Sequence, residues 1–142
     1  MKVRINWVED MLYIGEAGSG HAIAIDGPPD LGGKNLGPRP MELLLLGLGS
    51  CSAVDVVSIL KKARQPVSDC VVEIDADRAE SIPKVFTKIR MHFIVTGNGL
   101  GEKQVERAVK LSAEKYCSAA AMLEKAAEIS HTFEVRDDNQ TQ

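Results

Sequence analysis

The sequence has few of the residues that mark specialised classes of protein. Aromatic residues make up 4% of its 142 residues, and it holds only three cysteines and one tryptophan. An odd number of widely spaced cysteines does not form a disulfide framework, so we expect a reducing cytoplasm. The net charge of −3 gives no basic surface for nucleic acid. We therefore expect neither a nucleic-acid-binding protein nor a disulfide-stabilised secreted domain.

Motifs for metals and nucleotides are also missing. The sequence contains no CxxC pair, no HExxH segment, no phosphate-binding loop and no GxGxxG turn after a strand. We therefore expect no metal and no cofactor. The chain opens with the strand-like MKVRINWV, so we expect no signal peptide. Its length fits a single domain over residues 1–142, with a frayed tail from about residue 137.

One long apolar run dominates the sequence at residues 40–64. Asp55 is the only charged residue between Leu43 and Leu60, and a helix of that composition is buried on every side. Pro40 suits the first helical position, and Pro66 prevents continuation of the helix. A bilayer needs about 20 apolar residues, but the aspartate and serines in this run favour a core helix over a membrane helix.

A single domain of this size has few layers with which to cover such a helix. We therefore expect a homodimer in which each subunit helps to enclose the helix of its partner.

Patterns on both sides of the helix predict an α+β fold. Six segments are predicted to be antiparallel strands: residues 2–7, 11–17, 21–26, 69–79, 84–96 and 129–135. Apolar and polar residues alternate in the first segment and the last three, whereas turn residues mark off the second and third. Residues 102–115 have the spacing of an amphipathic helix, and an alanine-rich helix follows at 118–127. The predicted order is βββ-α-ββ-αα-β, with helices segregated from antiparallel sheets.

The cysteines are the first candidates for chemistry. A thiol reacts as thiolate, but Cys51 lies far from the positive end of its helix, and Asp55, four residues on, disfavours the thiolate. From position alone, Cys51 and Cys117 are more often small core residues than functional ones. Cys70, on the apolar face of a strand, is expected to be structural. His131, on the apolar face of the last strand, is expected to be a core histidine with satisfied hydrogen bonds.

The segment PMELLLLGLGSCSAVDV, followed 66 residues after its cysteine by KYCSAA, resembles the OsmC/Ohr superfamily and within it the OsmC-like branch. The order of elements resembles that family over nearly the whole chain. The resemblance implies antiparallel sheets around a long buried central helix, in an intertwined homodimer. It also implies a peroxidase that reduces organic (alkyl or lipid) hydroperoxides. Cys51 would be the peroxidatic residue that becomes a sulfenic acid, and Cys117 the resolving residue that forms a disulfide, which a dithiol then reduces.

The sequence departs from the family around the first cysteine. Active members carry an arginine on the first hairpin and a glutamate directly after the proline that starts the helix. Here the hairpin reads WVEDML, Met41 follows the proline, and Glu42 lies one position later, turned by about 100°. Arg4 or Arg39 can replace the arginine from another direction. Two functions stay open: the peroxidase, or a protein without peroxidase activity that binds an apolar ligand or partner in the dimer-interface pocket.

Overall fold

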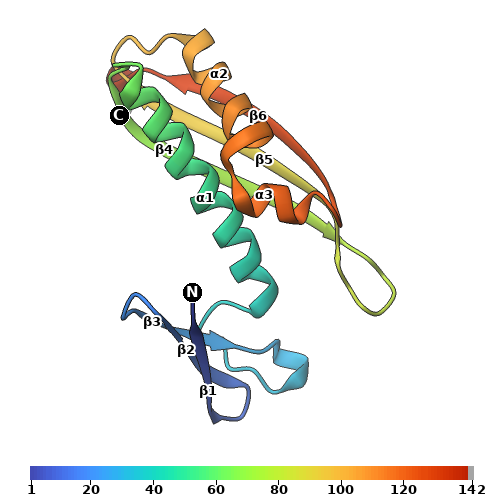
Figure 1. Ribbon diagram of the computed structural model, residues 1–142. Helices are drawn as coiled ribbons and strands as arrows, with labels where there is room; N and C mark the ends of the chain where they lie inside the picture. Colours follow the sequence, from blue (N-terminus) through green and yellow to red (C-terminus); the bar gives the residue numbers. More distant parts are fainter. Residues whose placement is uncertain (141–142) are drawn as a thin grey trace. The chain divides into compact units, whose positions relative to one another are not determined.

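The computed structural model describes residues 1–140 and divides into two compact units, Met1–Leu46 and Gly47–Gln142. The predicted α+β class and the order of the main elements are confirmed (Figure 1). Of the tail expected to fray from about residue 137, residues 141–142 lie outside the described part. Asp138–Gln140 form a short 3₁₀ turn, and the Ser68 hydroxyl donates a hydrogen bond to Asp138.

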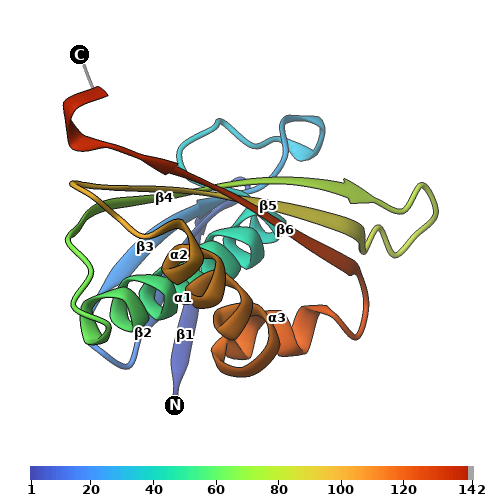
Figure 2. The ribbon, with the colours of Figure 1, turned by 90° about the horizontal axis from the view of Figure 1, so that it is seen from above.

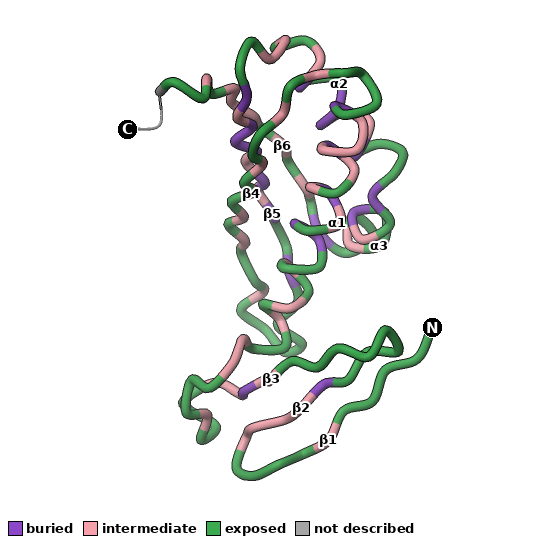
Figure 3. Tube along the Cα trace, turned by 90° about the vertical axis from the view of Figure 1, so that its left-hand side faces the viewer, coloured by how far each residue is buried: buried purple, intermediate pink, exposed green. Residues whose placement is uncertain are grey.

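The first unit contains a three-stranded antiparallel sheet and the loop that leads into the long helix. Its strands are β1 (Val3–Glu9), β2 (Leu12–Ala17) and β3 (Ala22–Asp26). The long helix is α1 (Pro40–Lys62), which begins in this unit and continues into the second unit from Gly47. Figure 3 shows that most of this sheet is exposed in the single chain. Its exposed side chains include Val3, Ile5 and Trp7, the last of these 66% exposed. An apolar sheet face therefore lies open to solvent.

Asp26, at the end of β3, holds the long loop in place. Its buried carboxylate accepts hydrogen bonds from the backbone N–H groups of Gly27 and Lys34, each 2.9 Å long, and of Leu36, 3.0 Å long. These backbone hydrogen bonds, the one from Leu36 above all, lower the pKa of the Asp26 carboxyl. The ionised side chain thus fixes the loop that delivers the chain to α1.

The second unit is a three-stranded sheet with helices on one face. The strands lie in the order β4 (Val67–Arg78), β5 (Phe86–Gly97), β6 (Glu128–Arg136). Figure 2 shows α1, α2 (Glu102–Leu111) and α3 (Ser118–Leu123) on the same side of this sheet. The predicted alternation in β5 is confirmed, because Ile89, Met91, Phe93 and Val95 are all buried. On the polar face, Arg90 forms salt bridges with Asp75 and Asp77.

Two predicted details of this unit are wrong. The last strand, β6, pairs parallel to β5, whereas all strands were expected to be antiparallel. The segment from α2 to α3 is long enough to act as a crossover, so β6 can begin at the same end of the sheet as β5. The helices are also shorter than predicted: α2 ends at Leu111, a π-helical turn spans Ser112–Tyr116, and α3 ends at Leu123.

Helix α1 is buried along one face in the single chain. The buried residues are Leu48, Gly49, Ser52, Val56 and Leu60, whereas Val54 is 68% exposed. The prediction that this helix is buried on every side is therefore wrong for a single chain, because the β4–β5–β6 sheet covers only one face of it. The uncovered apolar residues need another surface, and we expect a second copy of the chain to supply it.

We therefore predict an obligate homodimer at micromolar concentration, since each apolar side chain that it buries contributes about 1.5–3 kcal/mol. Val54→Asp should weaken association by at least about 2 kcal/mol, because a charge would enter an apolar contact. Light scattering over a range of protein concentrations measures this. As a matched control, Val71→Asp changes an exposed valine of β4 and should leave the dimer intact. A stable, folded wild-type monomer would contradict the prediction.

The pKa of Asp26 predicts a second measurable property. Because the folded-state pKa is lowered from 3.8, the carboxylate stabilises the fold above that pH, and the stabilisation is lost as the pH falls through the folded-state value. The free energies of unfolding of the wild type and of Asp26→Asn, measured with denaturant, should therefore differ by a constant amount near neutral pH. The two values should converge in acid below pH 3.8. Asp30→Asn, in the same loop and exposed, is the control. A difference that persists undiminished in strong acid would refute the assignment.

Candidate functional site

Two thiols and a carboxylate meet on the inner side of the second unit. Cys51 and Asp55 lie one turn apart on α1, and Cys117 comes from the start of α3. The Sγ atoms of both cysteines and a carboxylate oxygen of Asp55 all lie within 4.8 Å of one another. Cys51 is half-buried, Cys117 is only 3% exposed, and neither forms a disulfide. The expectation that Asp55 shares a face with Cys51 is confirmed by this cluster.

The π-helical turn places Cys117 beside α1. The backbone N–H of Cys117 donates to the carbonyl of Ser112, five residues earlier, at 2.9 Å. Cys117 is then the N-cap of α3, and its Sγ accepts a hydrogen bond from the backbone N–H of Ala120 at 3.4 Å. Single π turns within helices often occur at functional sites. Here the turn sets where the second thiol lies.

Two buried serines contact two of the three groups, Cys117 and Asp55. The Ser52 hydroxyl donates to the Sγ of Cys117 at 3.2 Å. The Ser112 hydroxyl lies 3.2 Å from Asp55 Oδ2 and 3.4 Å from the carbonyl oxygen of Ser52, and can donate to either. Sequence reasoning did not select these serines for the site. The available signal was a polar residue, Ser112, at a position where the amphipathic pattern of the helix calls for an apolar one.

Burial governs the protonation state of the second thiol, Cys117. Removal from water raises the pKa of Cys117 above its ordinary value, while the hydrogen bonds from Ser52 and Ala120 act in the opposite direction. The neighbouring Cys51 raises the pKa further. Near neutral pH, Cys117 is therefore a neutral thiol, but with hydrogen-bond donors aimed at its sulfur.

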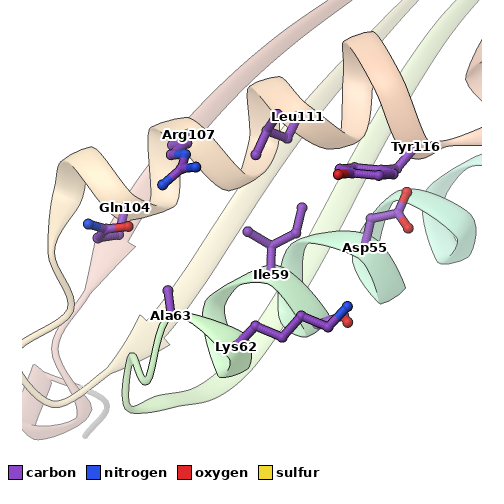
Figure 4. Close-up of a pocket in the computed structure, with 9 residues that line it drawn as sticks. Asp55, Ile59, Lys62, Ala63, Gln104, Arg107, Leu111 and Tyr116 are labelled. Atoms are coloured by element: carbon purple, nitrogen blue, oxygen red, sulfur yellow. The ribbon is translucent and has the colours of Figure 1, made fainter.

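A cavity of about 420 Å³ opens between α1 and α2 next to this cluster (Figure 4). Asp55 and Tyr116 lie at one end, and Ala63 and Gln104 at the other. Its remaining lining residues are both apolar and polar: Ser58, Ile59, Lys62, Arg107 and Leu111. Asp55 thus belongs both to the thiol cluster and to a space large enough for a small molecule.

The residues expected to support the first thiol lie in the other unit. The backbone N–H of Arg39 donates to Glu42 Oε2 at 2.8 Å, and its guanidinium lies 4.0 Å from Oε1 of the same carboxylate. The Nε of Arg4 donates to Asn6 Oδ1 at 3.1 Å. All of these belong to Met1–Leu46, whereas the cysteines belong to Gly47–Gln142. Support of Cys51 by Arg4, Arg39 or Glu42 stays a prediction.

Two further residues that the sequence singled out lie outside the cluster. Cys70 is half-buried on β4, where burial raises the pKa of its thiol. His131 stacks on Phe93 with ring centroids 6.2 Å apart, and burial lowers its pKa. Its buried Nε2 has no hydrogen-bond partner among the residues that the structure describes, so the expectation of a fully satisfied histidine is wrong.

Comparison with known proteins agrees with this architecture. The family model described as OsmC-like protein matches residues 32–132. Protein YhfA of Escherichia coli strain K12 is 53% identical over 135 residues, which cover 95% of this chain and 98% of YhfA. A hypothetical protein from Aquifex aeolicus VF5, solved by crystallography, is 34% identical with a TM-score of 0.85, over 96% of each chain. An organic hydroperoxide resistance protein OsmC from Legionella pneumophila shares the fold at 15% identity, with a TM-score of 0.72 over 94% of this chain and 96% of its own.

The cluster predicts how Asp55 affects the first thiol. Replacing Asp55 by asparagine removes a negative charge close to Cys51 at nearly constant shape, so alkylation of Cys51 at pH 7 should become faster. The rate is measured in a Cys70→Ser, Cys117→Ser background, so that only Cys51 reacts. Asp69→Asn, a distant carboxylate on β4, should leave the rate unchanged. An unchanged or slower reaction of the Asp55→Asn variant would show that another group controls this thiol.

Proposed function

Because the chain belongs to the OsmC-like family, we propose that it is a thiol-dependent peroxidase that reduces organic hydroperoxides through Cys51 and Cys117. The observation that carries this proposal is the approach of two free thiols, with Asp55, to within 4.8 Å. The name of the Legionella relative, an organic hydroperoxide resistance protein, supports the same chemistry.

In the first step, the Cys51 thiolate attacks an oxygen of the hydroperoxide. The O–O bond breaks, the sulfur keeps one oxygen as a sulfenic acid, and the alkoxide takes up a proton and leaves as an alcohol. Cys51 is suited to this step because it is half-buried, whereas Cys117 is almost inaccessible. The first cysteine is therefore the one that an incoming peroxide can reach.

In the second step, the Cys117 sulfur attacks the sulfur of the sulfenic acid. An S–S bond forms, and the hydroxyl group leaves as water with the proton of Cys117. The two Sγ atoms, at most 4.8 Å apart, must approach to about 2.05 Å, which needs only a local rearrangement. A dithiol reductant then supplies two electrons and restores both thiols.

The surroundings favour an apolar substrate. The cysteine lies on a helix that is largely apolar, although Ser52 and Asp55 lie close to it. The adjacent cavity is lined in part by Ile59, Ala63 and Leu111, and in part by polar residues. Alkyl or lipid hydroperoxides suit such surroundings better than hydrogen peroxide. The same cavity supports the alternative function, a protein that binds an apolar ligand or partner without using the thiols.

Membership of the family supports a proposal for the assembly and the compartment. OsmC-like proteins are soluble and commonly homodimers. Helix α1 is long and apolar enough to cross a membrane by length and composition, but in this family it is mostly a core helix. We propose an intertwined homodimer in the cytoplasm, where a reducing environment keeps both thiols available.

Cumene or tert-butyl hydroperoxide should convert the reduced protein to a form with an intramolecular disulfide between Cys51 and Cys117, with Cys70 free. Peptide mapping by mass spectrometry identifies the bond. Cys51→Ser should abolish peroxide consumption, because the attacking sulfur is gone. Cys117→Ser should consume one equivalent and then accumulate sulfinic acid at Cys51, since no thiol traps the intermediate.

Cys70→Ser is the matched control and should consume peroxide like the wild type. Equal consumption by wild type and Cys51→Ser would refute the peroxidase. If the wild type consumes no hydroperoxide, but a Cys51→Ser, Cys117→Ser variant still binds a fluorescent fatty-acid analogue, the alternative function is favoured.

A further inference from the structure

We propose that Cys51, Asp55 and Cys117 form a zinc-binding site in the reduced protein. Each contributes one ligand atom, and the three atoms lie within 4.8 Å of one another. In a tetrahedral zinc site, bonds of about 2.3 Å to sulfur and about 2.0 Å to oxygen place ligand atoms about 3.5–3.8 Å apart. Side-chain shifts of about 1 Å are therefore enough to close this cluster around an ion.

The donor set selects the metal. Two thiolates exclude magnesium and calcium, which prefer oxygen ligands, and the carboxylate favours Zn²⁺ over the softer Cu⁺. Three protein ligands leave the fourth position to water, as in zinc sites that are open to small molecules. Cys51 and Asp55 are only half-buried, so an ion and its water have a route to the site. No metal motif appears in the sequence because the ligands lie in two segments 66 residues apart.

The neighbouring hydrogen bonds suit a metal centre. The Ser112 hydroxyl lies within hydrogen-bonding distance of Asp55, which orients the carboxylate. The Ser52 hydroxyl and the backbone N–H of Ala120 both donate to the Cys117 sulfur. Outer donors of this kind fix the geometry of ligands and offset their negative charge. The cluster brings its ligands and these donors from a single chain, so we expect one ion per chain.

Zinc binding moves protons but no electrons. The ion displaces one proton from each thiol, and both sulfurs become metal-bound thiolates. The same two sulfurs carry the peroxidase cycle, so bound zinc should block oxidation of the thiols and inhibit turnover. This consequence rests on the proposed function, whereas the site itself does not.

The test is metal binding by the fully reduced protein. Zn²⁺ is supplied from a chromophoric chelator, and Co²⁺ serves as a spectroscopic probe with a sulfur-to-cobalt charge-transfer band. We expect one ion per chain. Cys51→Ser and Cys117→Ser should each weaken zinc binding by more than about 100-fold and reduce the band, and Asp55→Asn should weaken binding by about tenfold or more. Oxidation to the disulfide should abolish binding.

Asp69 and Cys70 offer a matched control, because this aspartate also lies next to a cysteine. Among the residues that the structure describes, this pair belongs to no cluster of possible metal ligands. Asp69→Asn and Cys70→Ser should bind zinc like the wild type. Failure of the reduced wild type to take zinc from the chelator, or undiminished binding by Cys51→Ser, would overturn the proposal. Zinc binding by a chain that consumes no hydroperoxide would uphold the site and refute only the peroxidase. Peroxide turnover without zinc uptake would refute only the site.

Discussion

The packing of α1 against the β4–β5–β6 sheet is the contact on which the second unit depends. A Cβ atom on Gly49 would stand 3.1 Å from Cδ1 of Ile74 on β4, so the helix lies closer to the sheet than most side chains would allow. That approach turns Ser52 and Val56 inward and leaves Cys51 at the edge of the buried face. Helix α1 has two glycines at which a close contact of this kind can form. Gly49 makes one, whereas a Cβ on Gly47 would meet nothing within 4 Å.

The buried hydrogen bonds around Cys117 suggest a common basis for both proposed activities. Donors from Ser52 and Ala120 point at a sulfur that is almost removed from water. Such donors stabilise a sulfur that carries negative charge more than a neutral thiol. Hydrogen-bond donors near the sulfur therefore stabilise both a thiolate that attacks a sulfenic acid and a thiolate that binds a cation. Which of the two occurs then depends on whether an oxidant or a metal ion arrives first.

Much of the fold follows from local patterns, and the rest does not for identifiable reasons. The apolar run bounded by Pro40 and Pro66 predicts α1, and alternation predicts β5, because burial of one face leaves a periodic trace. Alternation carries no information on strand direction, so the parallel pairing of β6 was missed. The apolar spacing predicted an α-helix through Ser112, where the chain instead forms a π turn. The pairing of Cys51 with Cys117 came from the family resemblance, because no local spacing links residues so far apart.

The π turn also makes the chain unusually sensitive to length at one place. A hydrogen bond over five residues, from Cys117 to Ser112, holds one residue more than an α-helical turn does. Loss of a single residue between them would let the segment relax into a regular helix and swing the following thiol by about 100°. Surface loops usually tolerate such deletions. A deletion among the exposed residues 114–116, in contrast, would move the second cysteine out of the site. In evolution, the extra residue and the thiol are therefore expected to be gained or lost together.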